Sequence, residues 1–288
     1  MPDLTALYDL IPRLLPFQCL EARFMQQALV ALLLLAPMTA AMGVQVVNFR
    51  MAFFADAISH SAFAGVAVGL LFGIDPRFSM PALGLGMGLG IIAVQRRSGL
   101  SADTVIGVFF SAMIAFGLAV VSRDRSLARD LQRFLYGDIL TISQPEILWL
   151  AGLFVVLLAY QAWGYNRMLA IGISPSLAQA HRVRVAGYQY SYAALLAVVT
   201  IFAVWAVGVL LVSALLIVPA AAARNLTRSA GGMFWWALVV GTTSAVAGLL
   251  VSAQDWARTA TGATVILFTC AWFVASLGVA LLRKEQAL

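Results

Sequence analysis

Eight long apolar runs constrain the fold of this chain more than any other feature of its sequence. They lie near residues 26–48, 52–73, 80–95, 103–122, 146–164, 188–223, 233–253 and 260–282. An α-helix of about twenty residues crosses the roughly 30 Å of hydrocarbon in a bilayer, and most of the runs are of that order. Hydrophobic residues make up 62% of the 288 residues and charged residues only 10%, too few to cover a soluble globule. We therefore predict an all-α fold, a polytopic transmembrane helical bundle.

The run over residues 188–223 is too long for a single crossing. Its 36 residues would form a helix of about 54 Å at about 1.5 Å per residue. Gly208 and Pro219 are the residues that can interrupt it, and irregular backbone at membrane depth is tolerated where it lines a protein cavity. The sequence therefore predicts a broken helix near 206–223 and eight or nine spans in total.

Basic residues favour one orientation of the bundle. With nine spans and the N-terminus outside, the inner segments hold ten Lys and Arg residues and the outer segments eight. Basic residues are enriched in inner loops, so we predict an N-out, C-in arrangement with the loop at about 165–187 inside. Residues 1–25 are predicted to form an N-terminal interfacial segment, with a short amphipathic helix through Leu4–Leu15, and residues 26–283 the transmembrane domain.

Several classes of function are excluded by missing motifs. A nucleotide-binding P-loop requires a Lys after its glycines, but the single Lys of the sequence, Lys284, follows an apolar run. The chain therefore lacks its own ATPase site, and its work is driven by a gradient or by another subunit. No H-E-x-x-H or G-x-S-x-G motif indicates a hydrolase, and no C-x-x-C indicates a thiolate zinc site. The net charge of +6 reflects topology rather than nucleic-acid binding.

Asp56 and His60 are the clearest ionisable residues inside an apolar run. Their spacing of four residues places both side chains on one helix face. A carboxylate in the bilayer costs about 2.5 kcal/mol or more, so such groups face a bundle interior or a pathway. One carboxylate and one imidazole form half a site for zinc or manganese. From the residues alone, a structural pair, a proton relay and a metal-translocation site all stay open.

Other polar features indicate local structure. Asp103 is expected in the first turn of a span, where its negative charge interacts favourably with the helix dipole. Asp138 is expected to lie in a turn. Ser174 followed by Pro175 predicts the start of a short helix, which is either a plain connector or a docking surface. The glycines at 84, 86, 88 and 90 have no strand before them, so we interpret them as helix-packing residues.

Four segments together resemble the membrane-spanning permeases of bacterial ABC importers for zinc, manganese and related divalent metals. They span residues 56–66, 103–111, 135–140 and 207–224, in the order of the family's blocks. In the first, Asp56 and His60 match the acid and the histidine of a signature in which Gly-Asp precedes a small-residue stretch, with Ala55 in place of the Gly.

The resemblance implies a division of labour between subunits. Two copies of the chain would pair around a path lined by Asp56 and His60 as metal ligands. Two cytoplasmic ATP-binding subunits would bind below and an extracytoplasmic metal-binding protein above. The resemblance also implies zinc or manganese as the transported substrate, iron being the third candidate, with ATP on the partner subunit and no permanently bound cofactor. The expected location is the bacterial inner membrane, in contact with lipid and not with nucleic acid.

The inner loop matches the segment that couples such permeases to their ATPase. The matching positions are Ser174, Pro175, Ala178 and Arg182. Ser174 and Ser176 occupy places where the family often has acids, and Arg182 one that is often Gly. The rival function is an ATPase-independent, proton-coupled metal carrier or channel that uses Asp56 and His60 as a relay.

Overall fold

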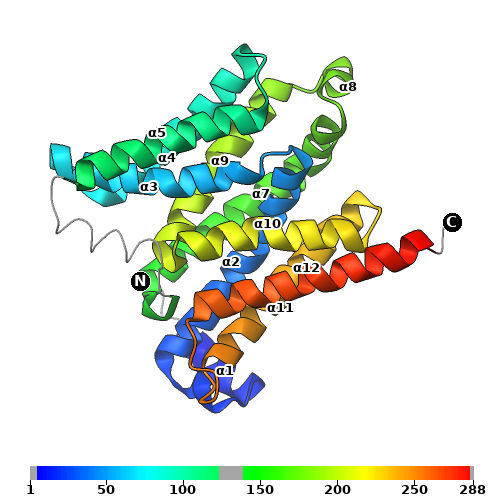
Figure 1. Cartoon of the computed structure of the whole chain (residues 1–288). Helices are drawn as coiled ribbons and strands as arrows, with labels where there is room; N and C mark the ends of the chain where they lie inside the picture. The colour runs from blue at the N-terminus through cyan, green and yellow to red at the C-terminus, as the bar shows by residue number, and fades with distance from the viewer. Residues whose placement is uncertain (1–4, 123–138, 286–288) are drawn as a thin grey trace.

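The computed structural model describes residues 5–122 and 139–285, and it forms a helical bundle (Figure 1). Nine helices within these ranges are long and apolar enough to cross a membrane. They are α2 (Arg23–Asn48), α3 (Ala52–Phe72), α4 (Pro76–Arg97), α5 (Ala102–Val121), α7 (Gln144–Ile173), α9 (Val185–Val207), α10 (Val209–Leu226), α11 (Ala230–Ser252) and α12 (Thr261–Glu285). The shorter elements are α1 (Thr5–Leu14), η1 (Gln18–Glu21), η2 (Ile139–Thr141) and α8 (Pro175–Ala180). The predicted all-α bundle is confirmed, with nine candidate spans rather than eight.

The long run at 188–223 is broken at Gly208. This residue has φ 88° and ψ 162°, a conformation that is essentially restricted to glycine. Helix α9 ends at Val207 and α10 begins at Val209, so the interruption is a single residue wide. Pro219 lies inside α10 without ending it. The broken helix is confirmed, but its break lies at the glycine and leaves 209–223 helical.

The predicted loop at 165–187 is wrong in its extent. Helix α7 continues through residues 165–173 and ends at Ile173, so only residues 174–184 connect it to α9, and six of these form α8. The physical reason is that nothing in 165–173 interrupts a helix. The first such signal is Pro175, which disfavours helical backbone at Ser174 before it, where φ is −156° and ψ 108°.

Close backbone contacts hold the centre of the bundle together. A Cβ built on Gly43 of α2 would lie 1.8 Å from the carbonyl oxygen of Leu216 in α10, so only glycine fits there. Gly84 packs against the side chain of Ile201, and Gly88 approaches Phe54. These two contacts confirm the packing interpretation of the glycine series, although its member Gly86 faces open space. Small residues thus let apolar helices approach closely where lipid offers no hydrophobic driving force.

Two hydrogen bonds join helix ends that lie on the α8 side of the bundle. Arg96 Nη1, at the end of α4, donates to Gln189 Oε1 near the start of α9, at 2.6 Å. Arg283 Nη1, near the end of α12, donates to the carbonyl oxygen of Leu226 at the end of α10, at 2.5 Å. Figure 1 shows α8, the α10–α11 turn and the C-terminal end of α12 toward the same side. This side carries the segments that the sequence predicts to be inside.

The N-terminal segment forms a short helix, as predicted. Helix α1 lies beside the start of α2, with the side chain of Tyr8 fully buried. The guanidinium carbon of Arg23 lies 4.1 Å from the centre of the Tyr8 ring, and Arg23 Nη1 lies 3.6 Å from Asp9 Oδ1. A cation–π contact and an ion pair therefore attach α1 to the first span. Its interfacial position stays a prediction.

Candidate functional site

Asp56 and His60 lie on the one partly exposed stripe of α3. Between Phe54 and Ala67 every residue of this helix is buried except Asp56, His60 and Phe63. His60 follows Asp56 by four residues and Phe63 follows His60 by three, so all three side chains lie on one face of the helix. Helix α3 starts at Ala52 on the side of α8, so Asp56 and His60 lie about 6 and 12 Å along its axis from that end.

Aromatic rings surround His60. Its ring centre lies 5.1 Å from that of Phe110 on α5, nearly perpendicular at 87°, and 5.5 Å from that of Phe63. These contacts turn the imidazole toward the groove between α3 and α5, and Asp56 interacts with it electrostatically from one turn away. The Phe63 and Phe110 rings take up space beside the imidazole, so fewer side-chain rotamers are open to His60.

Within the described part of the chain, neither Asp56 nor His60 has a hydrogen-bond or ion-pair partner. The neighbouring serines do not supply one. Ser61 Oγ donates to the carbonyl oxygen of Ile58 at 2.6 Å, and Ser59 Oγ is buried with no partner. The hypothesis of a purely structural pair therefore rests on the electrostatic interaction of Asp56 with His60 alone, without a hydrogen bond among the described residues.

One chain supplies only half of a metal site among the residues described. No group of three or more His, Cys, Asp or Glu side chains comes together within these ranges. The donor set of one carboxylate and one imidazole suits a borderline divalent cation such as zinc, which takes four ligands in closed sites. A complete site built on this pair needs ligands beyond those that the described residues bring together.

Helix α5 presents a wide uncovered face next to this pair. Gly107, Ser111 and Ala115 recur every four residues along it and are exposed. A Cβ built on Gly107 would meet no atom within 4 Å, so no described part of the chain covers this position. A face of small residues is suited to close contact with another helix.

The residues that the sequence predicts to couple the chain to an ATPase lie in and around α8. Ser174 is the N-cap of this helix, its Oγ accepting from the backbone N–H of Leu177 at 3.3 Å, and Pro175 is the first helical residue. Arg182 is exposed and has φ 60°, in the left-handed region that favours glycine. Ala178 is buried against its own chain and cannot touch a partner.

The sequence analysis missed two exposed apolar side chains at this end. Ile173 is 76% exposed and Leu177 is 57% exposed, at the end of α7 and within α8. These two side chains are available for contact at this end of the bundle. Their spacing of four residues was the available signal.

The remaining polar residues have local roles or lie outside the described ranges. Asp103 is exposed in the first turn of α5, where Ser101 Oγ accepts from the N–H of Thr104 at 3.2 Å as the cap. Cys19 and Cys270 are free thiols. Asp138 and the rest of 135–138 lie outside the described residues.

This combination of fold and site defines a class of protein. The described residues form nine helices able to cross a membrane, and one of these carries an acid and an imidazole, which is typical of a polytopic transport protein. The chain belongs to the ABC 3 transport family, whose profile matches residues 21–280. It is therefore a permease subunit of an ABC transporter, a multi-pass protein of the bacterial inner membrane.

Relatives cover nearly the whole chain. It is 30% identical over 250 residues to the high-affinity zinc uptake system membrane protein ZnuB of Haemophilus influenzae, covering 87% of this chain and 95% of that one. It is 29% identical over 273 residues to the manganese transport system membrane protein MntC of Listeria monocytogenes, covering 93% and 97%.

Solved structures share the fold. PsaBC from Streptococcus pneumoniae in complex with Fab contains a chain that matches with a TM-score of 0.75 and 26% identity, covering 94% of each chain. An inward-facing ABC transporter of metal-chelate type matches with a TM-score of 0.70 over 87% of this chain and 84% of that one; at 17% identity, this match speaks for the fold alone.

Proposed function

We propose that this chain is the membrane-spanning permease of an ATP-driven importer for divalent metal ions, with Asp56 and His60 as ligands on the path. The observation that carries the proposal is that, between Phe54 and Ala67, these two residues lie on the one partly exposed stripe of α3 and have no hydrogen-bond or ion-pair partner in the described part of the chain. Relatives named for zinc and manganese transport support the class of substrate.

A second copy of the chain would complete the site. Two copies related by a two-fold axis supply two carboxylates and two imidazoles, the number of ligands in a tetrahedral zinc site. The uncovered face of α5, with Gly107, Ser111 and Ala115, borders the stripe through Phe110 and is the surface on which we place the partner.

ATP hydrolysis belongs to a separate subunit that docks at α8. Ile173 and Leu177 offer it apolar contact, and Ser174 and Pro175 fix where the short helix begins. Arg182 lies exposed immediately beyond. Closure of the ATPase dimer would move these α8 segments and shift the permease between its two openings, a two-state change driven by a partner. An extracytoplasmic metal-binding protein would deliver the ion from the opposite side.

The test compares metal uptake by proteoliposomes that contain the permease with its ATPase. Asp56→Asn keeps the shape of the side chain and removes its charge, so we expect uptake of radioactive zinc or manganese to fall at least tenfold. Asp103→Asn is the matched control, because it removes an exposed carboxylate at a helix start and is expected to transport normally. Normal uptake by Asp56→Asn would refute the site.

His60→Gln tests the second ligand. The amide keeps the size of the side chain but is a poor ligand for zinc, so we expect zinc uptake to fall more than manganese uptake. His181→Gln is the control, since His181 is the other histidine of the sequence and lies exposed near α8. Metal uptake by the permease alone, without ATPase and driven by a proton gradient, would instead support the rival carrier.

A further inference from the structure

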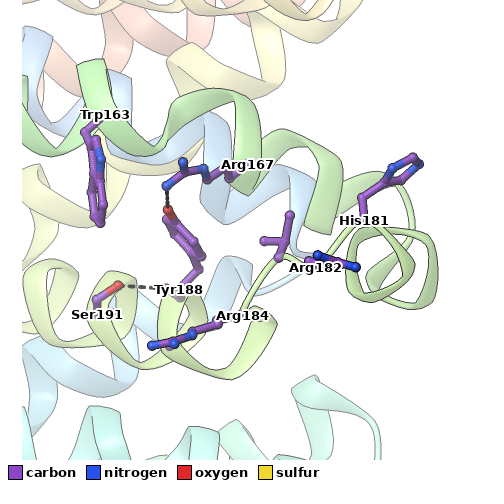
Figure 2. Close-up of a pocket in the computed structure, with 9 residues that line it drawn as sticks. Trp163, Arg167, His181, Arg182, Arg184, Tyr188 and Ser191 are labelled. Carbon is purple, nitrogen blue, oxygen red and sulfur yellow. Dashed lines mark hydrogen bonds between the residues drawn. The ribbon is translucent and has the colours of Figure 1, made fainter.

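Three arginines surround a pocket of about 590 Å³ at the end of the bundle that carries α8 (Figure 2). Arg167 comes from α7, and Arg182 and Arg184 from the connector before α9. Trp163 and Tyr188 line the same pocket, which opens between α7 and α9. The proposed metal site uses none of these residues, and the α8 docking surface shares only Arg182 with the pocket.

The pocket is strongly positive and has no acid to balance it. The ion pairs found in the described part of the chain are Arg23 with Asp9 and Arg258 with Asp255, both remote from this pocket in the sequence. None of the residues lining the pocket is acidic. Three uncompensated guanidinium groups favour a ligand that carries negative charge and several acceptor oxygens, such as a phosphate.

Arg167 is held in place before any ligand arrives. Its Nη1 donates a hydrogen bond to the hydroxyl of Tyr188, and its guanidinium carbon lies 5.4 Å from the centre of the Trp163 ring. Figure 2 shows the Arg167 and Tyr188 side chains pointing toward each other across the pocket. A guanidinium fixed in this way loses little freedom on binding an anion.

The length of α7 and its residue pattern place the pocket at the expected level of lipid headgroups. Trp163 is 19 residues from the start of α7, about 28 Å along the helix, which is close to the roughly 30 Å thickness of the hydrocarbon. The exposed face of α7 is apolar through Val155, Val156, Ala159 and Trp163, and turns polar at Arg167 one helical turn later. An exposed tryptophan followed by an arginine is typical of the boundary between hydrocarbon and headgroups.

The lining favours a lipid over the ATPase as the occupant. Trp163 is 69% exposed on the same face of α7 as the apolar residues that precede it, so its ring belongs against acyl chains. Residues 173–180, which hold the other residues that we assign to the ATPase, contribute none of the lining, so Arg182 is the one docking residue in the pocket. A basic pocket between spans at this level suits the phosphate of an acidic lipid.

We propose that this pocket binds the headgroup phosphate of an anionic phospholipid. Arg167 and Arg184 contact the phosphate oxygens, Arg182 adds positive charge at the rim, and Trp163 packs beside the first part of an acyl chain. The bound lipid packs beside two side-chain hydrogen bonds that join α7 to α9, from Arg167 to the Tyr188 hydroxyl and between Tyr160 and Ser191 at 2.9 Å. It therefore stabilises the connector that carries α8.

The test measures lipid retained by the purified transporter, permease with its ATPase, in native mass spectrometry after addition of phosphatidylglycerol or phosphatidylcholine. We expect the wild type to retain phosphatidylglycerol in preference. The double change Arg167→Gln with Arg184→Gln should reduce that retention at least tenfold and leave phosphatidylcholine unchanged. Arg184→Lys, which keeps the charge, should retain most of it and shows that the fold tolerates substitution.

Arg228→Gln is the matched control, because Arg228 is exposed in the α10–α11 turn, on the same side of the bundle and outside the pocket. Equal loss by this control would overturn the proposal in favour of general surface charge. Unchanged lipid retention by the double variant would also overturn the proposal. If the double variant instead loses the ATPase while it keeps the lipid, the arginines bind an acidic protein surface. Displacement of the lipid by inorganic phosphate alone would identify a site for soluble anions instead.

Discussion

Gly65 is the residue on which the position of α3, and therefore of the candidate ligands, most directly depends. A Cβ built on it would lie 2.6 Å from Cα of Met80 and 3.1 Å from its backbone nitrogen, both on α4. Because these are backbone atoms, a rotamer change cannot relieve the clash. Gly65→Ala therefore forces α3 and α4 apart by about 1 Å before carbon atoms reach their ordinary separation of about 3.5–4.0 Å.

The expected loss of stability follows from two opposing terms. Overpacking of this kind costs about 1–3 kcal/mol, while replacing glycine by alanine inside a helix gains about 0.5–1 kcal/mol. The separation also stretches the hydrogen bond from Ser79 Oγ to the Gly65 carbonyl oxygen, which is 2.7 Å long. We expect Gly65→Ala to lower the free energy of unfolding by about 1–2 kcal/mol.

The assay is unfolding by SDS in mixed micelles, followed by tryptophan fluorescence. Gly86→Ala on α4 is the matched control, because a Cβ there meets no atom within 4 Å, and it should unfold at the same or a higher SDS fraction than the wild type. Metal uptake by Gly65→Ala should fall as well, since a shift of about 1 Å exceeds the roughly 0.5 Å that a binding site tolerates. Wild-type stability and uptake in Gly65→Ala would refute the reasoning.

Three further predictions concern helix ends and connectors. The Glu146 carboxylate accepts a hydrogen bond from Trp205 Nε1 at 2.9 Å and also forms part of the capping box at the start of α7. Glu146→Ala removes both interactions, so the free energy of unfolding should fall by about 1–3 kcal/mol in the same SDS titration. An unchanged midpoint would contradict this. Asp9→Asn should change stability by less than about 1 kcal/mol, because its pair with Arg23 is solvent-exposed, and a larger loss would show that the pair matters more than its exposure indicates. Arg182→Gly should raise stability by up to about 1 kcal/mol by relieving a left-handed residue, whereas destabilisation would mean that the side chain makes a contact that outweighs the strain.

The sequence predicted the spans well because one physical requirement dominates them. A backbone inside hydrocarbon must satisfy its own hydrogen bonds, so each apolar run of sufficient length becomes a helix. The same requirement explains the preference for Gly208 over Pro219 as the break. A proline within a helix removes only one hydrogen bond and Pro219 is buried inside α10, while the conformation at Gly208 is closed to other residues.

Loop boundaries were harder to predict because charge and helix termination are separate signals. The basic residue Arg167 and the polar Asn166 suggest a loop, yet they lie on a helix that extends beyond the hydrocarbon. The correct signal was the pair Ser174 and Pro175, which the sequence analysis used for the start of α8 but not for the end of α7. The burial of Ala178 was likewise hidden, since it depends on how α8 folds back against its own chain.

For the candidate site, the sequence supplied the ligand types and their common face, but not the reason why that face is special. Alanines, serines and glycine close the rest of α3 against α4, α5 and the centre of the bundle, so one stripe of three side chains is left partly exposed. A helix fixed so tightly can hold two ligands in register without any hydrogen bond between them. If Asp56 and His60 are ligands as proposed, two ligands per chain would give weak binding until a second chain adds its own, and an ion bound in one arrangement of two chains could be released in the other.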